Sequence, residues 1–304
     1  MIERCTINFQ VELTSYCDLT CGYCPNKDME RSRAFMSDEV WNIILHRYIV
    51  PYKDYNRHCT PTFIGHKDGE PLLNKKFTER LKDLSNVCPD MNIDIYSHGL
   101  MLPKLAAQGR DLFDFLVTLP NHVRYLMSHH PRNHDGSVND YSPVISYLRE
   151  VLRDRKPHNV EFITVSHQSK HVTRDMQEGW KEVWEGLSIT VHCNVSLNPW
   201  TGRIEEEGTT KFNGCPYGDF GHWFFGVTGN IVGCCLDLEE EIVLGNVLKE
   251  DPEIMFNATE GFYRDQRKAL SDGRKPLYDV CMNCFGYERP NIPQELISLG
   301  VKTS

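Results

Sequence analysis

The sequence predicts an α/β protein with a parallel sheet, followed by a smaller α+β unit that contains a β-hairpin. In the first two thirds, short apolar segments alternate with helix-like segments, a pattern typical of parallel βαβ units. After about residue 193 the pattern changes, and six of the 12 cysteines lie in this last third. A chain of 304 residues with 40% hydrophobic composition suffices for one large domain and a small appendage. We therefore divide the chain into residues 1–192 and 193–304.

The strand candidates of the first part are short and rich in apolar and β-branched residues. They comprise residues 7–13, 60–65, 91–97, 123–128, 160–165 and 187–192. Helices are predicted between them, including one over residues 37–48 with Ser37 as N-cap, one that begins at Ser142, and one after Thr173. Six strands are fewer than the eight of a closed barrel. A doubly wound sheet and an open, partial barrel both fit this pattern.

In the last third, two strand-like segments flank a turn-forming tripeptide, which predicts a hairpin. The segments are residues 222–227 and 231–235, on either side of Thr228-Gly229-Asn230. A helical stretch is expected near residues 260–270.

The overall charge and the cysteine content exclude several classes of protein. The net charge is −9, whereas dedicated nucleic-acid binders are usually basic. No apolar run approaches the roughly 20 residues that span a bilayer, and residues 1–5 have no signal-peptide pattern. We therefore expect a cytoplasmic protein without a membrane segment. Because stable disulfides are rare in the cytoplasm, metal ligation is the leading explanation for the cysteines.

Three cysteines with CxxxCxxC spacing directly follow the first predicted strand. They are Cys17, Cys21 and Cys24, and Gly22 allows the loop to curve tightly. One such loop can present three thiolates to a cubic iron–sulfur cluster and leave the fourth iron without a protein ligand. An open coordination position is typical of catalytic metal sites, whereas a structural zinc site needs four ligands. The spacing therefore favours a redox-active cluster over zinc.

This motif, with the aromatic Tyr23 before its last cysteine, resembles the radical S-adenosylmethionine (radical SAM) superfamily. The resemblance covers nearly the whole chain and implies a partial (β/α)6 barrel for residues 1–192. It also implies that the open iron of a [4Fe–4S] cluster binds S-adenosylmethionine. In that family, reductive cleavage of S-adenosylmethionine gives a deoxyadenosyl radical that removes a hydrogen atom from the substrate.

The same resemblance suggests residues that contact S-adenosylmethionine. Gly69-Glu70-Pro71 follows the second strand and is similar to the family's Gly-Gly-Glu motif, although Asp68 replaces the first glycine. Acceptors of this kind would hold the amino group of S-adenosylmethionine. Ser97 and His98 follow the third strand, where relatives often have Thr-Asn. Further contacts are expected at the ends of the next two strands, from Ser128 and Ser166.

The C-terminal third contains a second possible metal site. Cys281 and Cys284 form a CxxC pair, and Cys215 and Cys234 complete a set of four thiolates that suits a closed iron–sulfur or zinc site. The spacing does not distinguish Cys234 from Cys235. The region resembles the SPASM and twitch extensions of radical SAM enzymes, and most closely the shorter twitch form. That resemblance implies one auxiliary [4Fe–4S] cluster, and Cys193 is expected to be a free thiol.

These motifs predict an enzyme that oxidises, or otherwise modifies, a small polar metabolite such as a sugar, cyclitol or nucleoside. Resemblance to a twitch-bearing inosamine dehydrogenase implies hydrogen-atom removal, loss of a proton and transfer of an electron to the auxiliary cluster. The sequence does not identify the base, and the candidates are His66, His98, His129 and His130. Peptide or RNA modification, a redox-neutral outcome, and a non-catalytic zinc or iron–sulfur module are the alternatives. We expect a monomer that receives electrons from an external donor such as flavodoxin or ferredoxin.

Overall fold

The strands of the structure form one continuous sheet. The computed structural model describes residues 7–53, 60–167, 169, 172–195, 203, 215 and 221–284. Within these residues the sheet has nine strands in the order β6-β5-β4-β3-β2-β1-β7-β8-β9. The strands are β1 (Ile7–Val11), β2 (Thr62–Ile64), β3 (Asn92–Ser97), β4 (Val123–His129), β5 (Val160–His167), β6 (Thr190–Val195), β7 (Gly221–Phe225), β8 (Asn230–Val232) and β9 (Val243–Asn246).

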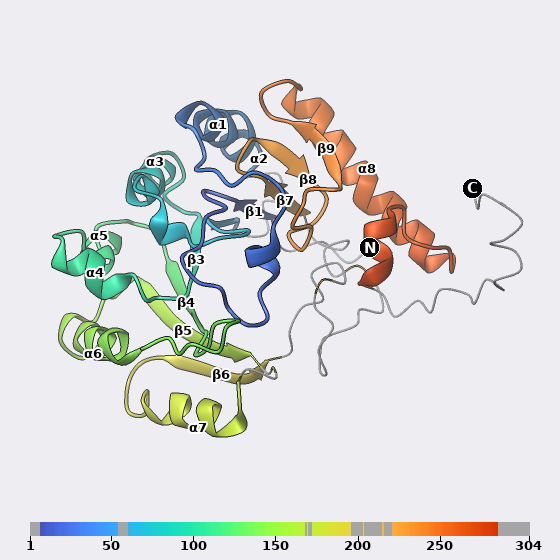
Figure 1. Ribbon diagram of the computed structural model, residues 1–304. Coiled ribbons are helices and arrows are strands. Elements are labelled where there is room, and N and C mark those ends of the chain that lie inside the picture. Colours follow the sequence, from blue (N-terminus) through green and yellow to red (C-terminus); the bar gives the residue numbers. More distant parts are fainter. Residues whose placement is uncertain are drawn as a thin grey trace, which may run out of the picture.

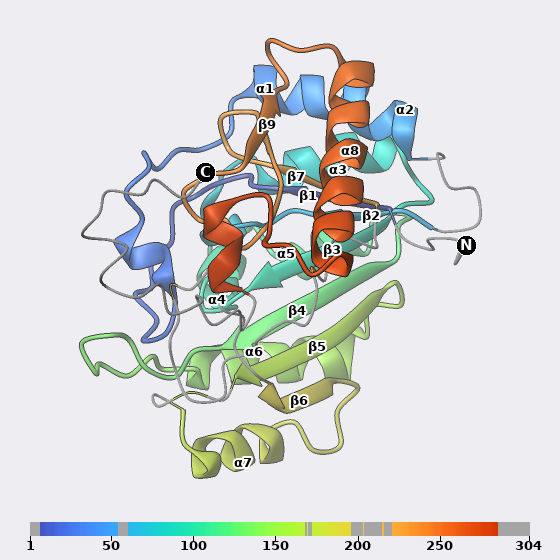
Figure 2. The same ribbon diagram turned by 90° about the vertical axis from the view of Figure 1, so that its right-hand side faces the viewer.

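The strand order decides between the two folds that the sequence left open. Each of β1 to β6 pairs in parallel with the next strand along the chain. Right-handed crossovers between sequential neighbours place every connecting helix on the same face of the sheet. Figure 1 shows α1, α3, α4, α6 and α7 along the outer side of the strand arc, and Figure 2 shows β1 to β6 following one another in order. The arrangement is an open, partial barrel, as predicted, and not a doubly wound sheet.

Most of the helices that cover this outer side begin at a polar cap or a proline, although α3 has neither. They are α1 (Asp38–Ile43), α2 (Val50–Tyr52), α3 (Phe77–Val87), α4 (Leu102–Ala107), α5 (Leu112–Leu116), α6 (Ser142–Glu150) and α7 (Arg174–Glu182). The side chains of Ser37 and Thr173 accept hydrogen bonds from backbone N–H groups three residues on, as N-caps do. A π-helical stretch over Ile44–Ile49 joins α1 to α2, so this helical segment extends beyond its predicted end. None of the helices in the described ranges could cross a membrane.

The hydrophobic core lies between the sheet and these helices. Along β4, Val123, Tyr125 and Met127 are buried in alternation with less buried residues. The buried set faces the helices, so the alternate residues face the concave side. On β4 the inner side therefore carries Arg124, Leu126 and Ser128.

The C-terminal hairpin continues the barrel sheet. Strand β7 pairs in parallel with β1 and antiparallel with β8, which confirms the predicted hairpin around Gly229. Helix α8 (Pro252–Ser271), longer than the predicted stretch, covers the hairpin, and the Tyr263 hydroxyl donates to the carbonyl of Gly233. The predicted boundary after residue 192 falls within β6. The division into two domains stays a prediction.

Two differences from the predicted elements have local causes. Strand β6 begins at Thr190 because residues 184–189 form hydrogen-bonded turns, with Leu187 N–H donating to Trp184 and Ile189 N–H donating to Leu187. Strand β9 was not predicted. Its sequence Val-Leu-Gly-Asn is too short and too glycine-rich to be distinguished from a loop without the pairing of β8.

Candidate active site

The cysteine loop lies between β1 and α1, at the carboxyl end of the first strand. Backbone contacts fasten it to two other loops. The N–H of Gly22 donates to the carbonyl of Arg132, and the N–H of His134 donates to that of Thr20. On the other side, the N–H of Glu70 donates to the carbonyl of Tyr16 over 2.7 Å. The loop that bears the three cysteines is therefore held by its neighbours from both sides.

The three thiols are buried close enough together to influence one another. Burial raises the pKa of Cys17 to about 12 and the pKa of Cys24 to about 11. Burial also raises the pKa of Cys21, as do the neighbouring charges of Cys24 and Cys17. All three are free thiols. Such a group is protonated by itself at neutral pH, but a bound cationic metal cluster reverses this preference and converts the thiols into ligands. The donor set therefore fits an iron–sulfur cluster.

Gly69 allows the predicted Gly-Glu-Pro loop to pack directly on the cysteine loop. Its φ is +83°, and a Cβ at this position would lie 2.6 Å from the carbonyl oxygen of Tyr16 and 2.7 Å from that of Thr14. Only glycine combines this backbone conformation with such a close approach. Pro71 then begins a 3₁₀ turn, Pro71–Leu73.

The carboxylate of Glu70 connects the second and third strands at their carboxyl ends. It is 2% exposed and accepts hydrogen bonds from the Leu72 N–H, the Ser97 hydroxyl and the His98 N–H at 2.8–3.1 Å. Because both oxygens already accept bonds from the chain itself, Glu70 orders the surrounding backbone. The structure thus brings Gly69, Glu70, Ser97 and His98 together, beside the cysteine loop.

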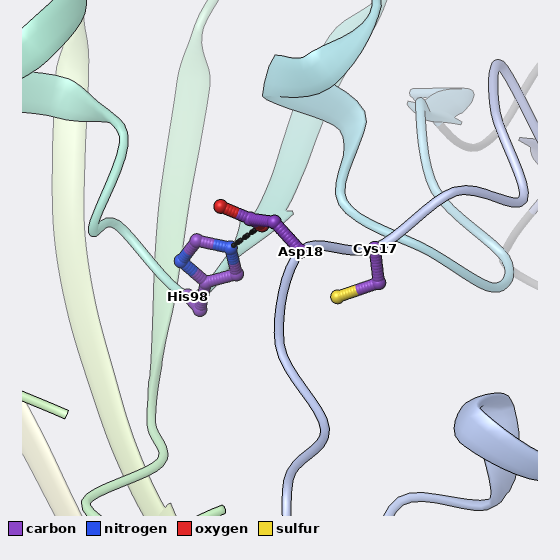
Figure 3. A group of neighbouring side chains, drawn as sticks. All are labelled: Cys17, Asp18 and His98. Carbon is purple, nitrogen blue, oxygen red and sulfur yellow. Dashed lines mark hydrogen bonds and ion pairs between the residues drawn. The ribbon is translucent and has the colours of Figure 1, made fainter. Parts of the chain in front are cut away.

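His98 also contacts the cysteine loop through its ring. Its Nε2 lies 2.9 Å from Oδ1 of Asp18 and 3.3 Å from Oε2 of Glu70. The Cys17 sulfur belongs to the same group, in which one ligand atom of each residue lies within 4.8 Å of the others. Figure 3 shows the imidazole and the Asp18 carboxylate pointing at each other, with Cys17 beside them. Asp18 is not among the residues predicted from the sequence, because the resemblance does not single it out.

Several histidines gather at the carboxyl ends of the strands. Burial lowers the pKa of His130 well below its usual value, and His167, His98, His129 and His66 lower it further. The Tyr23 hydroxyl and Nδ1 of His130 share a 2.6 Å hydrogen bond. Burial also lowers the pKa values of His66 and His129, so these two imidazoles and that of His130 are neutral at neutral pH and each can donate one hydrogen bond and accept another. Glu70 and Asp18 instead raise the pKa of His98 despite its burial. His167 is a further residue of this region that the sequence does not predict, although it follows Ser166 directly.

Not all of the predicted strand-end residues face the concave side. His129 stacks on Trp180 of α7 with ring centroids 3.9 Å apart, and its Nδ1 lies 3.2 Å from the Ser166 hydroxyl. Ser166 is fully buried. Both residues therefore lie on the helix-covered face. Ser128 alternates with His129 along β4 and faces the concave side. A contact of Ser128 or Ser166 with a cofactor stays a prediction.

The four cysteines predicted for the second site also converge in space. Burial raises the pKa of Cys281, and the next largest contributions come from Cys234, Cys284 and Cys215. The sulfur of Cys234 accepts a hydrogen bond from the Leu236 N–H at 3.3 Å. Cys235 is 9% exposed and lies in the apolar cluster under α8. The arrangement fits four thiolates around one metal centre, and Cys234 rather than Cys235 as the fourth ligand stays a prediction. Cys193 instead donates to the Gln177 carbonyl.

Comparisons with known proteins agree with both predicted regions. Residues 215–285 match the SPASM family, an iron–sulfur cluster-binding domain. A crystal structure of BtrN in complex with AdoMet and 2-DOIA has a TM-score of 0.63 and 17% identity, over 93% of this chain and 94% of that chain. A structure of anSMEcpe with bound AdoMet and Cp18Cys peptide has a TM-score of 0.55 and 16% identity, over 92% and 86%. No curated protein matches significantly in sequence. The chain therefore has the fold of the radical SAM enzymes and carries an iron–sulfur cluster-binding SPASM domain in its last third.

Proposed function

We propose that this protein is a radical SAM oxidoreductase that dehydrogenates a small polar metabolite. The observation that carries the proposal is the packing of Gly69 and Glu70 against the loop of Cys17, Cys21 and Cys24. This contact joins a three-thiol cluster site to a cradle of backbone acceptors at the carboxyl ends of parallel strands. Active sites of parallel βα folds lie at that end.

We assign two [4Fe–4S] clusters and S-adenosylmethionine as cofactors. Cys17, Cys21 and Cys24 would hold the first cluster, and the second would be held by Cys215, Cys234, Cys281 and Cys284. When bound, the first cluster supplies the electron that cleaves S-adenosylmethionine to the radical that removes a hydrogen atom from the substrate. Zinc at the second site is the competing assignment, which the SPASM match disfavours.

The chain's own residues would orient the cofactor and handle the proton. Glu70 orders the backbone at Leu72 and His98, and main-chain carbonyls of the Gly-Glu-Pro loop would accept hydrogen bonds from the amino group of S-adenosylmethionine. Tyr23 belongs to the cysteine loop, shares a hydrogen bond with His130 and would pack beside the cofactor.

A neutral imidazole near the carboxyl ends of the strands would accept the proton that the hydroxyl or amine on the oxidised carbon must lose. His66 and His130, whose pKa values burial lowers, are the candidates for this role, whereas Glu70 and Asp18 raise the pKa of His98 and already pair with its ring. The electron that remains after the hydrogen atom and the proton have left would pass to the auxiliary cluster.

Two observations support a small substrate. Neutral imidazoles suit hydroxyl groups, because each can both donate and accept a hydrogen bond. The BtrN structure, which holds 2-DOIA, also aligns with almost the full length of both chains. A peptide substrate is the second candidate, since the similar anSMEcpe structure holds a peptide. An electron donor such as flavodoxin or ferredoxin, and a monomeric state, remain predictions.

The test is cleavage of S-adenosylmethionine by protein prepared without oxygen and then reduced. We expect deoxyadenosine from the wild type and none from a Cys17→Ala/Cys21→Ala/Cys24→Ala variant, because the first cluster would lose all its ligands. Cys193→Ala is the matched control and should leave cleavage unchanged. Deoxyadenosine formation by the triple variant would contradict the proposal. Screening sugars, cyclitols and nucleosides against short peptides for enhanced deoxyadenosine formation would then decide the substrate class.

A further inference from the structure

Two buried cations lie between the barrel and the C-terminal hairpin. The side chain of Lys67 is 0% exposed and that of Arg31 is 14% exposed. The acidic side chains around them are equally buried, with Glu12 at 0%, Asp68 at 2% and Glu240 at 6%. Burying such charges is expensive unless their geometry is fully satisfied, so a network of this kind specifies one arrangement of the segments it joins.

On the barrel side, the network connects the ends of the first two strands. Arg31 makes a bidentate pair with Glu12, with Nη2 and Nη1 at 2.5 and 3.0 Å from the two carboxylate oxygens. Its Nη2 also lies 3.1 Å from Oδ2 of Asp68, and Lys67 Nζ lies 2.6 Å from the same oxygen. Asp68 directly precedes Gly69. The ion pairs are therefore fixed to the loop that packs on the cysteine loop.

On the other side, the same two cations hold the segment that follows Cys234 and Cys235. Lys67 Nζ donates to the carbonyl of Asp237 at 2.8 Å, and Arg31 Nε donates to the carbonyl of Leu238 at 2.5 Å. The backbone N–H of Arg31 donates to the carboxylate of Glu239. Bonds from charged donors to backbone carbonyls are directional, so they fix the position of the main chain and not only its depth of burial.

Three further hydrogen bonds stabilise this connection between the barrel and the C-terminal segment. The second oxygen of Glu12 accepts the N–H of Val227 in the hairpin turn at 2.9 Å. The carboxylate of Asp237 accepts the N–H groups of Glu241 and Ile242, which fixes the segment internally. Segments that are about 200 residues apart in sequence thus share one buried set of charges.

We propose that Arg31 and Lys67 are positioning residues, which hold the segment Asp237–Glu240, and through it Cys234, at a fixed place relative to the Gly69–Glu70 loop. The carboxylate of Asp68 pairs with both cations and so holds them side by side. Its carboxylate explains why aspartate stands where the resembling family usually has glycine. The link to the auxiliary cluster rests on the proposed function. The attachment of Asp237–Glu240 to the Gly69–Glu70 loop through Arg31 and Lys67, which we call the clamp, rests only on the contacts above.

The test compares a Lys67→Met/Asp68→Asn variant with the wild-type holoenzyme. The double change removes a cation together with its anion, so it leaves no orphaned charge and the fold persists. The Asp68→Asn change keeps a side-chain oxygen that can accept a hydrogen bond from Arg31. The Lys67→Met change removes the ammonium group that donates to the carbonyl of Asp237. Arg153→Met, which removes an exposed ion pair with Asp154, is the matched control.

We expect amide hydrogen exchange in residues 236–242 to be about tenfold faster in the double variant, with exchange in β3 to β5 unchanged. We also expect the midpoint potential of the auxiliary cluster to shift, because the main chain around Cys234 moves. Unchanged exchange in residues 236–242 would overturn the clamp. Faster exchange with an unchanged potential would overturn its link to Cys234. A protein without a second cluster would contradict the proposed function, and the exchange measurement would still decide the clamp.

Discussion

At the scale of single residues, the candidate site depends on how closely two loops approach each other. The absence of a side chain at Gly69 lets the cysteine loop and the Gly-Glu-Pro loop share a backbone hydrogen bond. The site is therefore assembled from main-chain contacts before any cofactor is considered. Glu70 connects this junction to the end of β3, because its carboxylate accepts hydrogen bonds from the Ser97 hydroxyl and the His98 N–H.

Replacement of Gly69 by alanine should therefore separate the two loops. The added Cβ would meet backbone atoms at 2.6–2.8 Å, which cannot move aside as a flexible side chain can. We expect the free energy of unfolding in urea to fall by about 3 kcal/mol or more, and the first cluster to be lost. Gly109→Ala is the control, because its φ is also positive at +71° but nothing lies within 4 Å of the new Cβ. It should cost only about 1 kcal/mol of backbone strain. Equal losses in the two variants would contradict this account.

The sequence predicts some of these residues and not others, for a physical reason. Cys17, Cys21 and Cys24 are recognisable because ligands that share one loop need a fixed spacing. Arg31 and Asp18 carry no such signal. Their partners are far away in sequence, and an isolated arginine or aspartate in a loop is usually solvated.

At the scale of elements, the predictions were most accurate where a local signal fixes the start of a helix. Ser37 and Thr173 were predicted as the residues before helices and act as caps in the structure. The ends of β6 and of the first helical segment were less accurate, because pairing and packing with distant segments determine them. The contact between β4 and α7 is of this second kind, since His129 and Trp180 meet only in the folded chain.

The burial of His129 against Trp180 predicts that the stability of the protein depends on pH. Burial lowers the pKa of His129 to about 4, compared with about 6.5 in an unfolded chain. Between these values the unfolded state binds more protons than the native state, so stability falls as the pH decreases from about 6.5 to about 4. In this range one such histidine changes the free energy of unfolding by up to about 1.4 kcal/mol per pH unit.

The prediction is tested by urea denaturation of the cluster-free protein across this pH range. A His129→Phe variant keeps an aromatic ring against Trp180 but cannot take up a proton. We expect its stability to decrease less steeply on acidification than that of the wild type. His122→Gln, at a side chain that is 53% exposed, should keep the wild-type slope. Identical slopes for His129→Phe and the wild type would rule out a role for His129.

At the scale of the whole molecule, the strand order is the result that the sequence could not supply. Hydrophobic alternation identifies strands, but their neighbours depend on which crossovers the connections allow. The same limit applies to the hairpin. Its turn is evident at Gly229, whereas its parallel pairing with β1 has no local signal.

The two cluster sites should be separable even though they share one sheet. A Cys281→Ser/Cys284→Ser variant removes two of the four thiolates of the C-terminal site and leaves the loop of Cys17 untouched. We expect iron to fall from about eight to about four atoms per chain, because one of two four-iron clusters is lost. Iron analysis with electron paramagnetic resonance of the reduced protein would check this. Cys193→Ser is the control, and iron content unaffected by the double change would show that other residues form the second site.

The position of β1 between β2 and β7 has a consequence for biosynthesis. A nascent chain that has not yet reached Gly221 lacks the strand that occupies one edge of β1, and the Glu12 N–H lacks the Phe225 carbonyl to which it donates. The ribosome thus releases β1 about 200 residues before the strand that pairs with its second edge exists. Domains generally complete their folding only when such non-local pairings form. Closure of the sheet around β1, and delivery of iron and sulfide to the C-terminal site, should therefore follow the synthesis of most of the chain.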